Sequence, residues 1–380
     1  MEAEKVMIRR TESQKEELLR VRDFVSRLGF AASDRDGDGA ITRRLYNEHA
    51  AEKYQAMLIP RDHGGRGDDY LTAGIICEEL SYYGIGFMPA LLTTVHCAEL
   101  IKIAATEKQR DVYLDAIADG KKVFGFCLTE EAAGSDISGI TCEARESDDS
   151  YIISGEKSVV INSAIADYFI VIASTNPAAG RAALNAFVVD ASLPGVDCDN
   201  SRFDFGFNQS VIGSVRFRDV HIPKENILGE NGSGYFLVME TFDKGRPLVA
   251  AACTGAARRA LDITAAYTKG RSQFGKELFS FQGVSFRLAD IATRIRAAKL
   301  LYRDALSRID EGAEFSMEAS MAKLYASETL RDAAEFGLEM LGYRGFSGDS
   351  ELRKIFNDAQ LLISIDGSSN VQRMVIASQL

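Results

Sequence analysis

Residues 121–139, KKVFGFCLTEEAAGSDISG, mark the point where the periodicity of the chain changes. Before this segment, apolar residues recur at the three- and four-residue spacing of amphipathic helices. From Val123 onward, apolar residues follow the two-residue alternation of strands, beginning with Phe124, Phe126 and Leu128. The segment therefore predicts a helical unit that ends near residue 120 and a β unit that begins at residue 121.

Upstream of this boundary, two capping boxes indicate where helices begin. Thr11 pairs with Gln14 and Thr106 pairs with Gln109, each in the spacing that satisfies the free N–H groups of a first turn. Helical patterns also cover residues 41–57, 71–83 and 90–105. We expect residues 1–120 to form an all-helical N-terminal domain.

Downstream, short apolar runs are separated by Gly, Asp and Asn turns. They occupy residues 151–153, 159–161, 168–172, 186–189, 211–217 and 220–222, which predicts a central antiparallel sheet or barrel over residues 121–230. Longer helical patterns then cover residues 234–268, 281–311, 316–341, 351–364 and a last segment from 370, which predicts a C-terminal four-helix bundle over residues 231–380. The fold class predicted is α+β.

Composition narrows the possible functions. The 380 residues carry 44 basic and 55 acidic side chains, a net charge of -11, which argues against binding to nucleic acid or to an anionic membrane. We expect neither a secretory signal nor a membrane span. The six cysteines are scattered without a CxxC pair, which indicates reduced thiols and a bacterial cytoplasm, or less plausibly a mitochondrial matrix.

One candidate for acid–base chemistry lies near the C-terminus, in residues 357–373, NDAQLLISIDGSSNVQR. Asp366 follows an apolar run and precedes Gly367, so a tight turn would hold its carboxylate beside buried chain. Desolvation raises the pKa of a carboxylate toward the range useful to a general base. The alternative interpretation is that Asp366 caps the last helix, as Asp-Gly pairs often do.

Other motifs carry weaker signals. Residues 34–45 resemble an EF-hand loop, but Leu45 stands where a bidentate Glu is needed, so a solvated turn is favoured and no metal is expected. His63 is interpreted as a loop residue. His96 is interpreted as a packed helix residue, because no His or Asp lies three or four positions after it.

Two loops combine small residues with hydrogen-bonding groups. Residues 127–139 offer Thr129, Ser135 and several backbone N–H groups that could approach a planar polar ring or a pyrophosphate. Residues 268–283 place Arg271 and Phe274 between helices, where they could hold a phosphate and stack on a base. A solvated turn is the alternative for each loop.

The order of LTEEAAGSD, FDKGRP, RSQFGK, LGYRGF and the C-terminal segment resembles the acyl-CoA dehydrogenase family over essentially the whole chain. The resemblance implies an FAD enzyme that removes two hydrogens across the α and β carbons of an acyl-CoA thioester. It also implies a homodimer or homotetramer that passes electrons to an electron-transferring flavoprotein.

The resemblance further implies roles for individual residues. Asp366 stands at the position of the family's catalytic Glu, with its backbone N–H directed at the thioester oxygen. The implied substrate-binding residues are Ser135, Asp243, Arg246 and Gly367. The implied cofactor-binding residues are Phe126, Leu128, Thr129, Ser135, Val159, Ile161, Arg271, Gln273, Phe274, Gln282, Glu339, Ser368 and Asn370, of which Arg271, Gln273, Phe274 and Gln282 would reach the FAD of a neighbouring subunit.

Several positions depart from the family pattern. Asp366 is one methylene shorter than Glu, and Gly245 leaves the family's alternative base position without a carboxylate. Val159 and Ile161 replace an aromatic residue and a Thr beside the flavin, and Glu339 replaces a Gln. These differences leave open an unusual acyl group, a carrier-protein substrate, an oxidase, desulfinase or nitroalkane oxidase-like activity, or a non-catalytic partner subunit.

Overall fold

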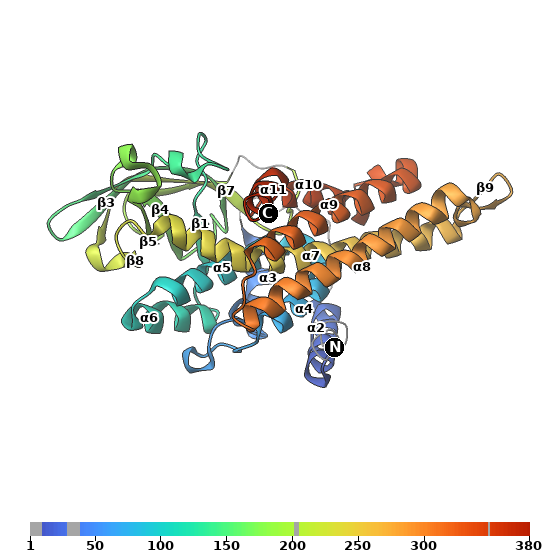
Figure 1. The fold of residues 1–380 in the computed structure, drawn as a ribbon, viewed down its shortest axis with the longest axis horizontal. Coiled ribbons are helices and arrows are strands. Elements are labelled where there is room, and N and C mark those ends of the chain that lie inside the picture. The colour runs from blue at the N-terminus through green and yellow to red at the C-terminus, as the bar shows by residue number, and fades with distance from the viewer. Residues whose placement is uncertain (1–9, 29–38, 201–204, 349) are drawn as a thin grey trace.

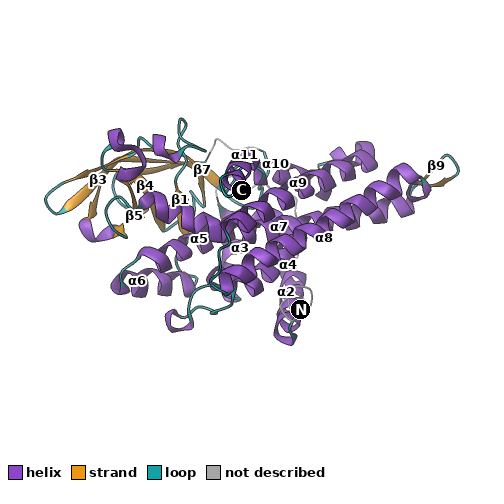
Figure 2. Ribbon diagram, viewed as in Figure 1, coloured by secondary structure: helices purple, strands orange, loops and turns teal. Residues whose placement is uncertain are grey.

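The computed structural model describes residues 10–28, 39–200, 205–348 and 350–380. The molecule is elongated, with a sheet at one end and long helices running to the other end (Figure 1). Figure 2 shows that, apart from one small hairpin, the strands are confined to one half of the molecule. The predicted α+β class, with helical domains on both sides of a central β domain in sequence, is confirmed. The acidic positions of the EF-hand-like loop, Asp34, Asp36 and Asp38, lie outside the described residues.

The N-terminal helices are α2 (Glu12–Leu28), α3 (Ala40–Ala51), α4 (Tyr70–Gly84), α5 (Met88–Ala104) and α6 (Glu107–Ala118). Both predicted capping boxes are present, at Thr11 with Gln14 and at Thr106 with Gln109. The helix expected over residues 41–57 ends earlier, at Ala51. Lys53 adopts a left-handed φ of 58°, which turns the chain into a short 3₁₀ segment.

Helices α4 and α5 form the apolar centre of the molecule. The stretch Tyr70–Ala104 is long and apolar enough, by length and composition alone, to cross a membrane. However, 94% of its apolar window is buried within the fold, as in the core helix of a globular protein. The mostly apolar character of this stretch is therefore explained by neighbours on every side.

The central domain is one mixed sheet. Its strands are β1 (Phe124–Cys127), β2 (Glu143–Glu146), β3 (Ser150–Ile161), β4 (Tyr168–Ser174), β5 (Leu184–Asp190), β6 (Val196–Asp199), β7 (Ile212–Pro223) and β8 (Ile227–Leu228). They follow the order β6-β7-β3-β2-β4-β5-β8, with β1 paired to β4. Most pairs are antiparallel as expected, but β1 and β2 both run parallel to β4. The runs at 151–153 and 159–161 belong to one strand, β3, whose register with β7 shifts near Gly155.

The C-terminal helices are α7 (Gly234–Gly270), α8 (Gln282–Asp310), α9 (Ser316–Leu341), α10 (Glu351–Leu362) and α11 (Ser369–Ala377). The hairpin β9 (Ser272–Gln273) and β10 (Lys276–Glu277) joins α7 to α8 at the far end of the molecule (Figure 1). Helix α7 packs against α4, α8 and α9. A Cβ at Gly255 would lie 1.9 Å from the carbonyl oxygen of Glu78, so only glycine permits this approach of α7 to α4.

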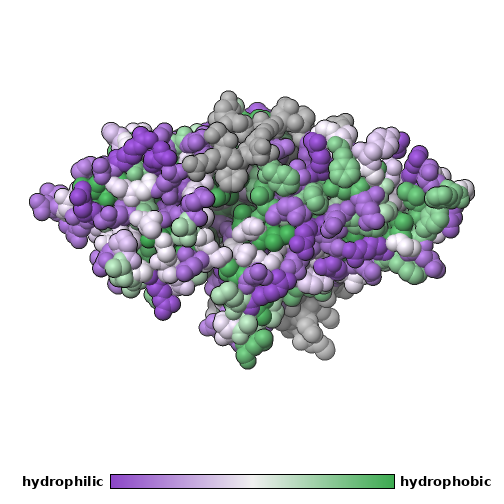
Figure 3. Space-filling model, turned by 90° about the horizontal axis from the view of Figure 1, so that it is seen from above, coloured by the Kyte–Doolittle hydropathy of each residue, from purple (hydrophilic) through white to green (hydrophobic). Residues whose placement is uncertain are grey.

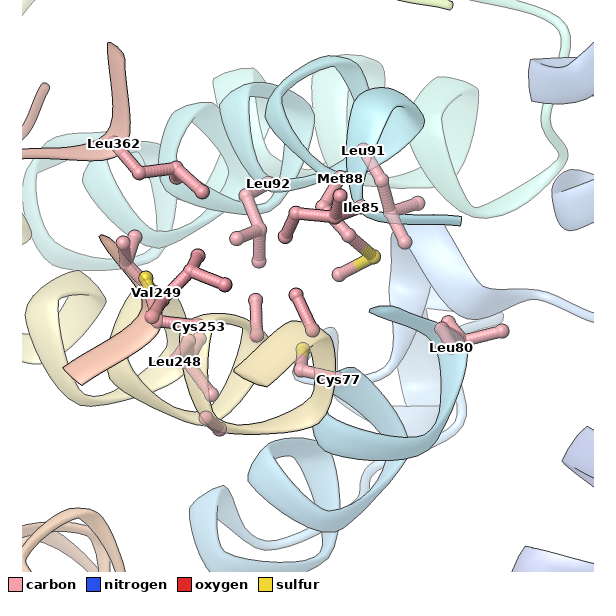
Figure 4. Close-up of a cluster of buried hydrophobic side chains, with 14 of the residues drawn as sticks. Cys77, Leu80, Ile85, Met88, Leu91, Leu92, Leu248, Val249, Cys253 and Leu362 are labelled. Atoms are coloured by element: carbon pink, nitrogen blue, oxygen red, sulfur yellow. The ribbon is translucent and has the colours of Figure 1, made fainter. Parts of the chain in front are cut away.

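Helix α10 is anchored in the core between α5 and α7. Leu362, its last residue, lies in one buried cluster with Leu92 of α5 and Val249 of α7 (Figure 4). Fully burying a side chain of this size contributes about 1.5–3 kcal/mol. The segment after α10 contains Asp366. The buried Leu362 therefore fixes the position at which this segment begins.

A buried carboxyl group ties α10 to the segment before β7. Asp358 of α10 is buried, and its Oδ1 accepts a hydrogen bond of 2.5 Å from the backbone N–H of Phe207. Burial raises the pKa of Asp358 to about 7, although this hydrogen bond and Lys354 oppose the shift. Asp358 is consequently protonated in the folded protein under mildly acidic conditions.

The raised pKa of Asp358 predicts a pH dependence of stability. Between about pH 4 and 7 the unfolded chain releases a proton that the folded chain keeps, so the free energy of unfolding falls as the pH rises through this window. Asp358→Asn keeps the oxygen that accepts from Phe207 and should remove this dependence. At pH 8 the free energy of unfolding of the Asp358→Asn variant should be higher than that of the wild type by on the order of 2 kcal/mol.

Urea unfolding at several pH values would measure the effect, with the exposed carboxylate change Asp148→Asn as the control. Parallel pH profiles for the wild type and Asp358→Asn would contradict the prediction.

Candidate active site

Asp366 lies in a reversal of the chain between α10 and α11. Asp366 and Gly367 have left-handed φ values of 52° and 89°, and Asp is among the residues that tolerate this region. Lys323 of α9 donates from Nζ to the carbonyl oxygens of Ile363 at 3.0 Å and Gly367 at 2.8 Å. Gln372 of α11 donates from Nε2 to the carbonyl oxygens of Asp366 at 3.0 Å and Gly367 at 2.9 Å. Two buried side chains thus fix the backbone that carries Asp366.

The cap of α11 is Ser368 rather than Asp366. The Ser368 hydroxyl accepts from the backbone N–H of Val371 at 3.4 Å. The alternative interpretation of Asp366 as a helix cap was therefore wrong. The Asp366 side chain is 14% exposed and is left to face α5 and α7.

Burial also affects the cation beneath this turn. Lys323 is completely buried, and desolvation lowers its pKa to about 8, although Cys253 and Asp366 oppose the shift. Its ammonium group donates hydrogen bonds to the carbonyl oxygens that the left-handed turn directs inward. The sequence offered no signal for this role, because Lys323 lies on a helix about forty residues before the turn.

Helix α7 brings two of the predicted substrate residues to the same turn. Arg246 is buried and donates from Nε to the carbonyl oxygen of Asp366 at 3.4 Å. Asp243 pairs with Arg246 and accepts from the Ser316 hydroxyl at 2.8 Å. Burial raises the pKa of Asp243, with Arg246 opposing the shift. The Asp243–Arg246 pair thus supports the backbone of the candidate base.

On α5, His96 is an ionisable side chain that lies close to the carboxylate of the candidate base. Its Nδ1 lies 3.9 Å from Oδ2 of Asp366, and the residue is only 6% exposed. His96 also belongs to a row of rings, since its ring is 6.3 Å from that of Phe242, which is 5.7 Å from that of Phe126. The prediction that His96 is packed in a helix holds, but its contact with Asp366 was missed.

The ends of β1 and β3 present the other predicted cofactor residues. The backbone N–H of Ser158 donates to the carbonyl oxygen of Thr129 at 2.8 Å, so the two segments lie side by side. Each segment contains both partly exposed and buried residues. The partly exposed members are Phe126, Thr129, Val159 and Ile161, whereas Cys127, Leu128 and Val160 are buried.

This arrangement fits the flavin that the resemblance implies. A ring system placed beside Phe126 would find apolar contacts on Val159 and Ile161 and hydrogen-bonding groups at Thr129. The buried Nε2 of His96 packs against Gly245 of α7 and has no hydrogen-bond partner among the described residues. The described residues contain no cluster of His, Cys, Asp or Glu that could hold a metal ion.

A buried ion pair fixes the loop that contains Thr129 and Ser135. Lys157 is fully buried and donates from Nζ to Glu130 Oε1 at 2.7 Å and to the Leu128 carbonyl oxygen at 3.0 Å. Burial raises the pKa of Glu130, but Lys157 and the hydrogen bonds from Thr141 outweigh it and lower the pKa. Ser135 itself is exposed, five residues beyond Glu130.

The remaining predicted cofactor residues do not gather at one place within one chain. Gln273 and Phe274 lie on the terminal hairpin, with Arg271 and Gln282 at its two ends (Figure 1). Phe274 is 95% exposed. Glu339 is exposed near the end of α9, and Asn370 is exposed on α11. A single chain therefore does not assemble all the predicted cofactor contacts.

Comparisons with known proteins match the chain from end to end. The N-terminal, middle and C-terminal domains of acyl-CoA dehydrogenase match residues 11–121, 125–220 and 232–380. A short-chain specific acyl-CoA dehydrogenase of Megasphaera elsdenii is 33% identical over 376 residues, covering 97% of this chain and 98% of that protein.

Two further similarities cover nearly the same length. The Caffeyl-CoA reductase-Etf complex subunit CarC of Acetobacterium woodii is 33% identical over 344 residues, 90% of each chain. The solved structure of butyryl-CoA dehydrogenase from Megasphaera elsdenii superposes with a TM-score of 0.90 at 31% identity, covering 98% of this chain and 99% of that one.

The Glu130–Lys157 pair gives a test of loop stability. Lys157→Met leaves a buried carboxylate without its cation and should lower the free energy of unfolding by about 3–5 kcal/mol. The matched change Lys224→Met removes an exposed pair with Glu146 and should cost at most about 1 kcal/mol. Chemical denaturation measures both variants, and equal effects would show that the buried pair does not hold the loop.

Proposed function

Because this chain belongs to the acyl-CoA dehydrogenase family, we propose that it is an FAD-dependent oxidoreductase that introduces an α,β double bond into an acyl-CoA thioester. The observation that carries the proposal is the placement of Asp366. Its carboxylate is mostly buried, its backbone is fixed from α7, α9 and α11, and it faces α5.

In this proposal the residues of the site have separate roles. Asp366 accepts the α-proton of the thioester on a carboxylate oxygen. Its backbone N–H donates to the thioester carbonyl oxygen, where negative charge develops as the proton leaves. Arg246 and Gly367 hold the turn in place, and Ser135 and Asp243 lie toward the substrate's CoA portion. Closure of the site around substrate excludes water and strengthens these interactions.

Phe126, Leu128, Thr129, Val159 and Ile161 would hold the flavin ring, and Ser135 would bind its pyrophosphate. FAD bound there supplies the two-electron acceptor for the hydrogen that leaves the β carbon. Ser368 and Asn370 would contact the adenine side. The short side chain of Asp366 places its carboxylate about 1.5 Å closer to the backbone than that of Glu, which favours an acyl group that sits deep against the turn.

The electron acceptor that we propose is an electron-transferring flavoprotein. The Acetobacterium relative is named as a subunit of a complex with Etf, and it is similar over 90% of this chain. A steady-state assay tests this assignment: turnover with a dye acceptor but not with oxygen would support it over an oxidase. A colourless protein that cannot be reconstituted with FAD would instead indicate a non-catalytic subunit.

We also propose that the active form is a homodimer or homotetramer. Large exposed apolar side chains gather on the helical half of the molecule, at Phe274, Phe286, Tyr343 and Phe346. Figure 3 shows apolar surface at the end where the β9–β10 hairpin lies. A second copy covering this end would bring Arg271, Gln273, Phe274 and Gln282 toward a cofactor that neither chain surrounds alone.

Asp366→Asn tests the base directly. The amide keeps the size of the side chain but cannot accept the α-proton, so substrate should no longer bleach the flavin absorbance. FAD should remain bound, as its visible spectrum will show. A panel of acyl-CoAs identifies the wild-type substrate first, and normal bleaching by the variant would remove Asp366 from the mechanism.

Phe274→Asn tests the subunit interface. Phe274 has a left-handed φ of 51°, which Asn tolerates better than Phe, so the hairpin should keep its conformation. Loss of the exposed ring should reduce the molecular mass in light scattering and release FAD on dilution. Phe236→Asn, at another exposed Phe near the sheet, should change neither, and unchanged assembly of Phe274→Asn would contradict the interface.

A further inference from the structure

Three residues from different elements fit together beside the candidate base. His96 comes from α5, Gly245 from α7 and Asp366 from the turn before α11. A Cβ at position 245 would lie 2.3 Å from Nε2 of His96. Any side chain at Gly245 would therefore displace the imidazole, and the absence of a side chain there is what allows His96 to reach Asp366.

The other charged groups around Asp366 act on the backbone. Arg246 donates to the carbonyl oxygen of Asp366 itself, and Lys323 donates to the carbonyl oxygen of Gly367. Asp243 is occupied by Arg246 and Ser316, and Cys253 is a buried thiol whose pKa burial raises to about 12. Among these groups, His96 faces the carboxylate oxygen, with Nδ1 3.9 Å from Oδ2.

We propose that His96 is a positioning residue, which donates a hydrogen bond from Nδ1 to Asp366 and holds the shorter carboxylate in line with the substrate's α carbon. This inference rests on the proposed function. The separation of 3.9 Å is longer than a hydrogen bond, and catalytic hydrogen bonds commonly tighten only when substrate binds. With one oxygen held by His96, the other oxygen of Asp366 takes the proton.

The pair also accounts for two departures from the family pattern. Asp in place of Glu loses about 1.5 Å of reach, and a misplacement near 1 Å can cost about a hundredfold in rate. A donor on the rigid helix α5 fixes the direction of the short side chain. Gly245, which lacks the family's alternative carboxylate, supplies the space that this donor occupies.

Two amide substitutions separate the donor atom from the bulk of the ring. His96→Asn places its amide N–H near the position of Nδ1, whereas His96→Gln places it near Nε2. We expect His96→Asn to retain kcat within about threefold and His96→Gln to lose about ten- to a hundredfold, with KM nearly unchanged in both. Steady-state assays with the best acyl-CoA and a dye acceptor measure these values.

A glycine pair tests the fit without altering the imidazole. Gly245→Ala should push His96 away from Asp366 and reproduce the loss seen in His96→Gln. Gly270→Ala, at the exposed end of the same helix, meets no atom within 4 Å and should leave kcat unchanged. Equal activity of His96→Gln and wild type, or equal losses in His96→Asn and His96→Gln, would overturn the proposal.

A measurement independent of turnover separates this inference from the proposed function. The chain has only four histidines, so ¹⁵N-histidine labelling of the complete protein gives few signals, and His96→Asn identifies that of His96. Asp366→Asn should shift the Nδ1 signal of His96 and leave those of His63 and His221 in place. An unchanged His96 signal overturns the pair. A shifted signal in a protein inactive toward every thioester supports the pair and removes the proposed function.

Discussion

Helix α7 approaches three different neighbours through positions that have no side chain. A Cβ at Gly234 would lie 2.7 Å from the backbone of Asn185 in β5, one at Gly245 would lie 2.3 Å from the His96 ring, and one at Gly255 would lie 1.9 Å from the Glu78 carbonyl oxygen. The sheet, the candidate site and the N-terminal helices are therefore all positioned by contact with one helix. The rest of the structure depends on this close approach, because α7 also packs against α8 and α9.

Buried charges supply the local precision that apolar packing lacks. Lys323 donates to carbonyl oxygens in the turn of Asp366, and Lys157 donates to Glu130 and to the Leu128 carbonyl oxygen beside the proposed flavin face. Such groups are costly to bury alone, so each requires its partner in a fixed position. Lys323 and Lys157 consequently fix two loops whose backbone hydrogen-bonding groups are not paired within a helix or a sheet.

The sequence predicted most of the fold because long helices and buried strands leave strong periodic signals. The C-terminal helices were located to within a few residues, from Gly234 through Ala377. Strands β2 and β6 were missed, since EARE and VDCD expose polar residues and are placed by their neighbours. The parallel pairing of β1 with β4 was also not foreseen, because local alternation does not encode strand direction.

The candidate site was less accessible to the same reasoning. Asp366 was found from its place between an apolar run and a glycine, and the family resemblance supplied the cofactor contacts, which stay predictions. The contact of His96 with Asp366 joins residues 270 positions apart, and no short-range pattern records it. The same holds for the alternative cap, since which of Asp366 and Ser368 caps α11 depends on the left-handed turn.

The dependence on α7 also has a consequence during synthesis of the chain. Helices α4 and α5, in the stretch Tyr70–Ala104, have a mostly apolar surface, and part of that surface is covered by a helix that begins 130 residues later. At the usual rates of translation, this delay is on the order of ten seconds. During that time the most hydrophobic segment of the nascent chain lacks its permanent neighbour, which makes it a natural binding segment for chaperones at the ribosome.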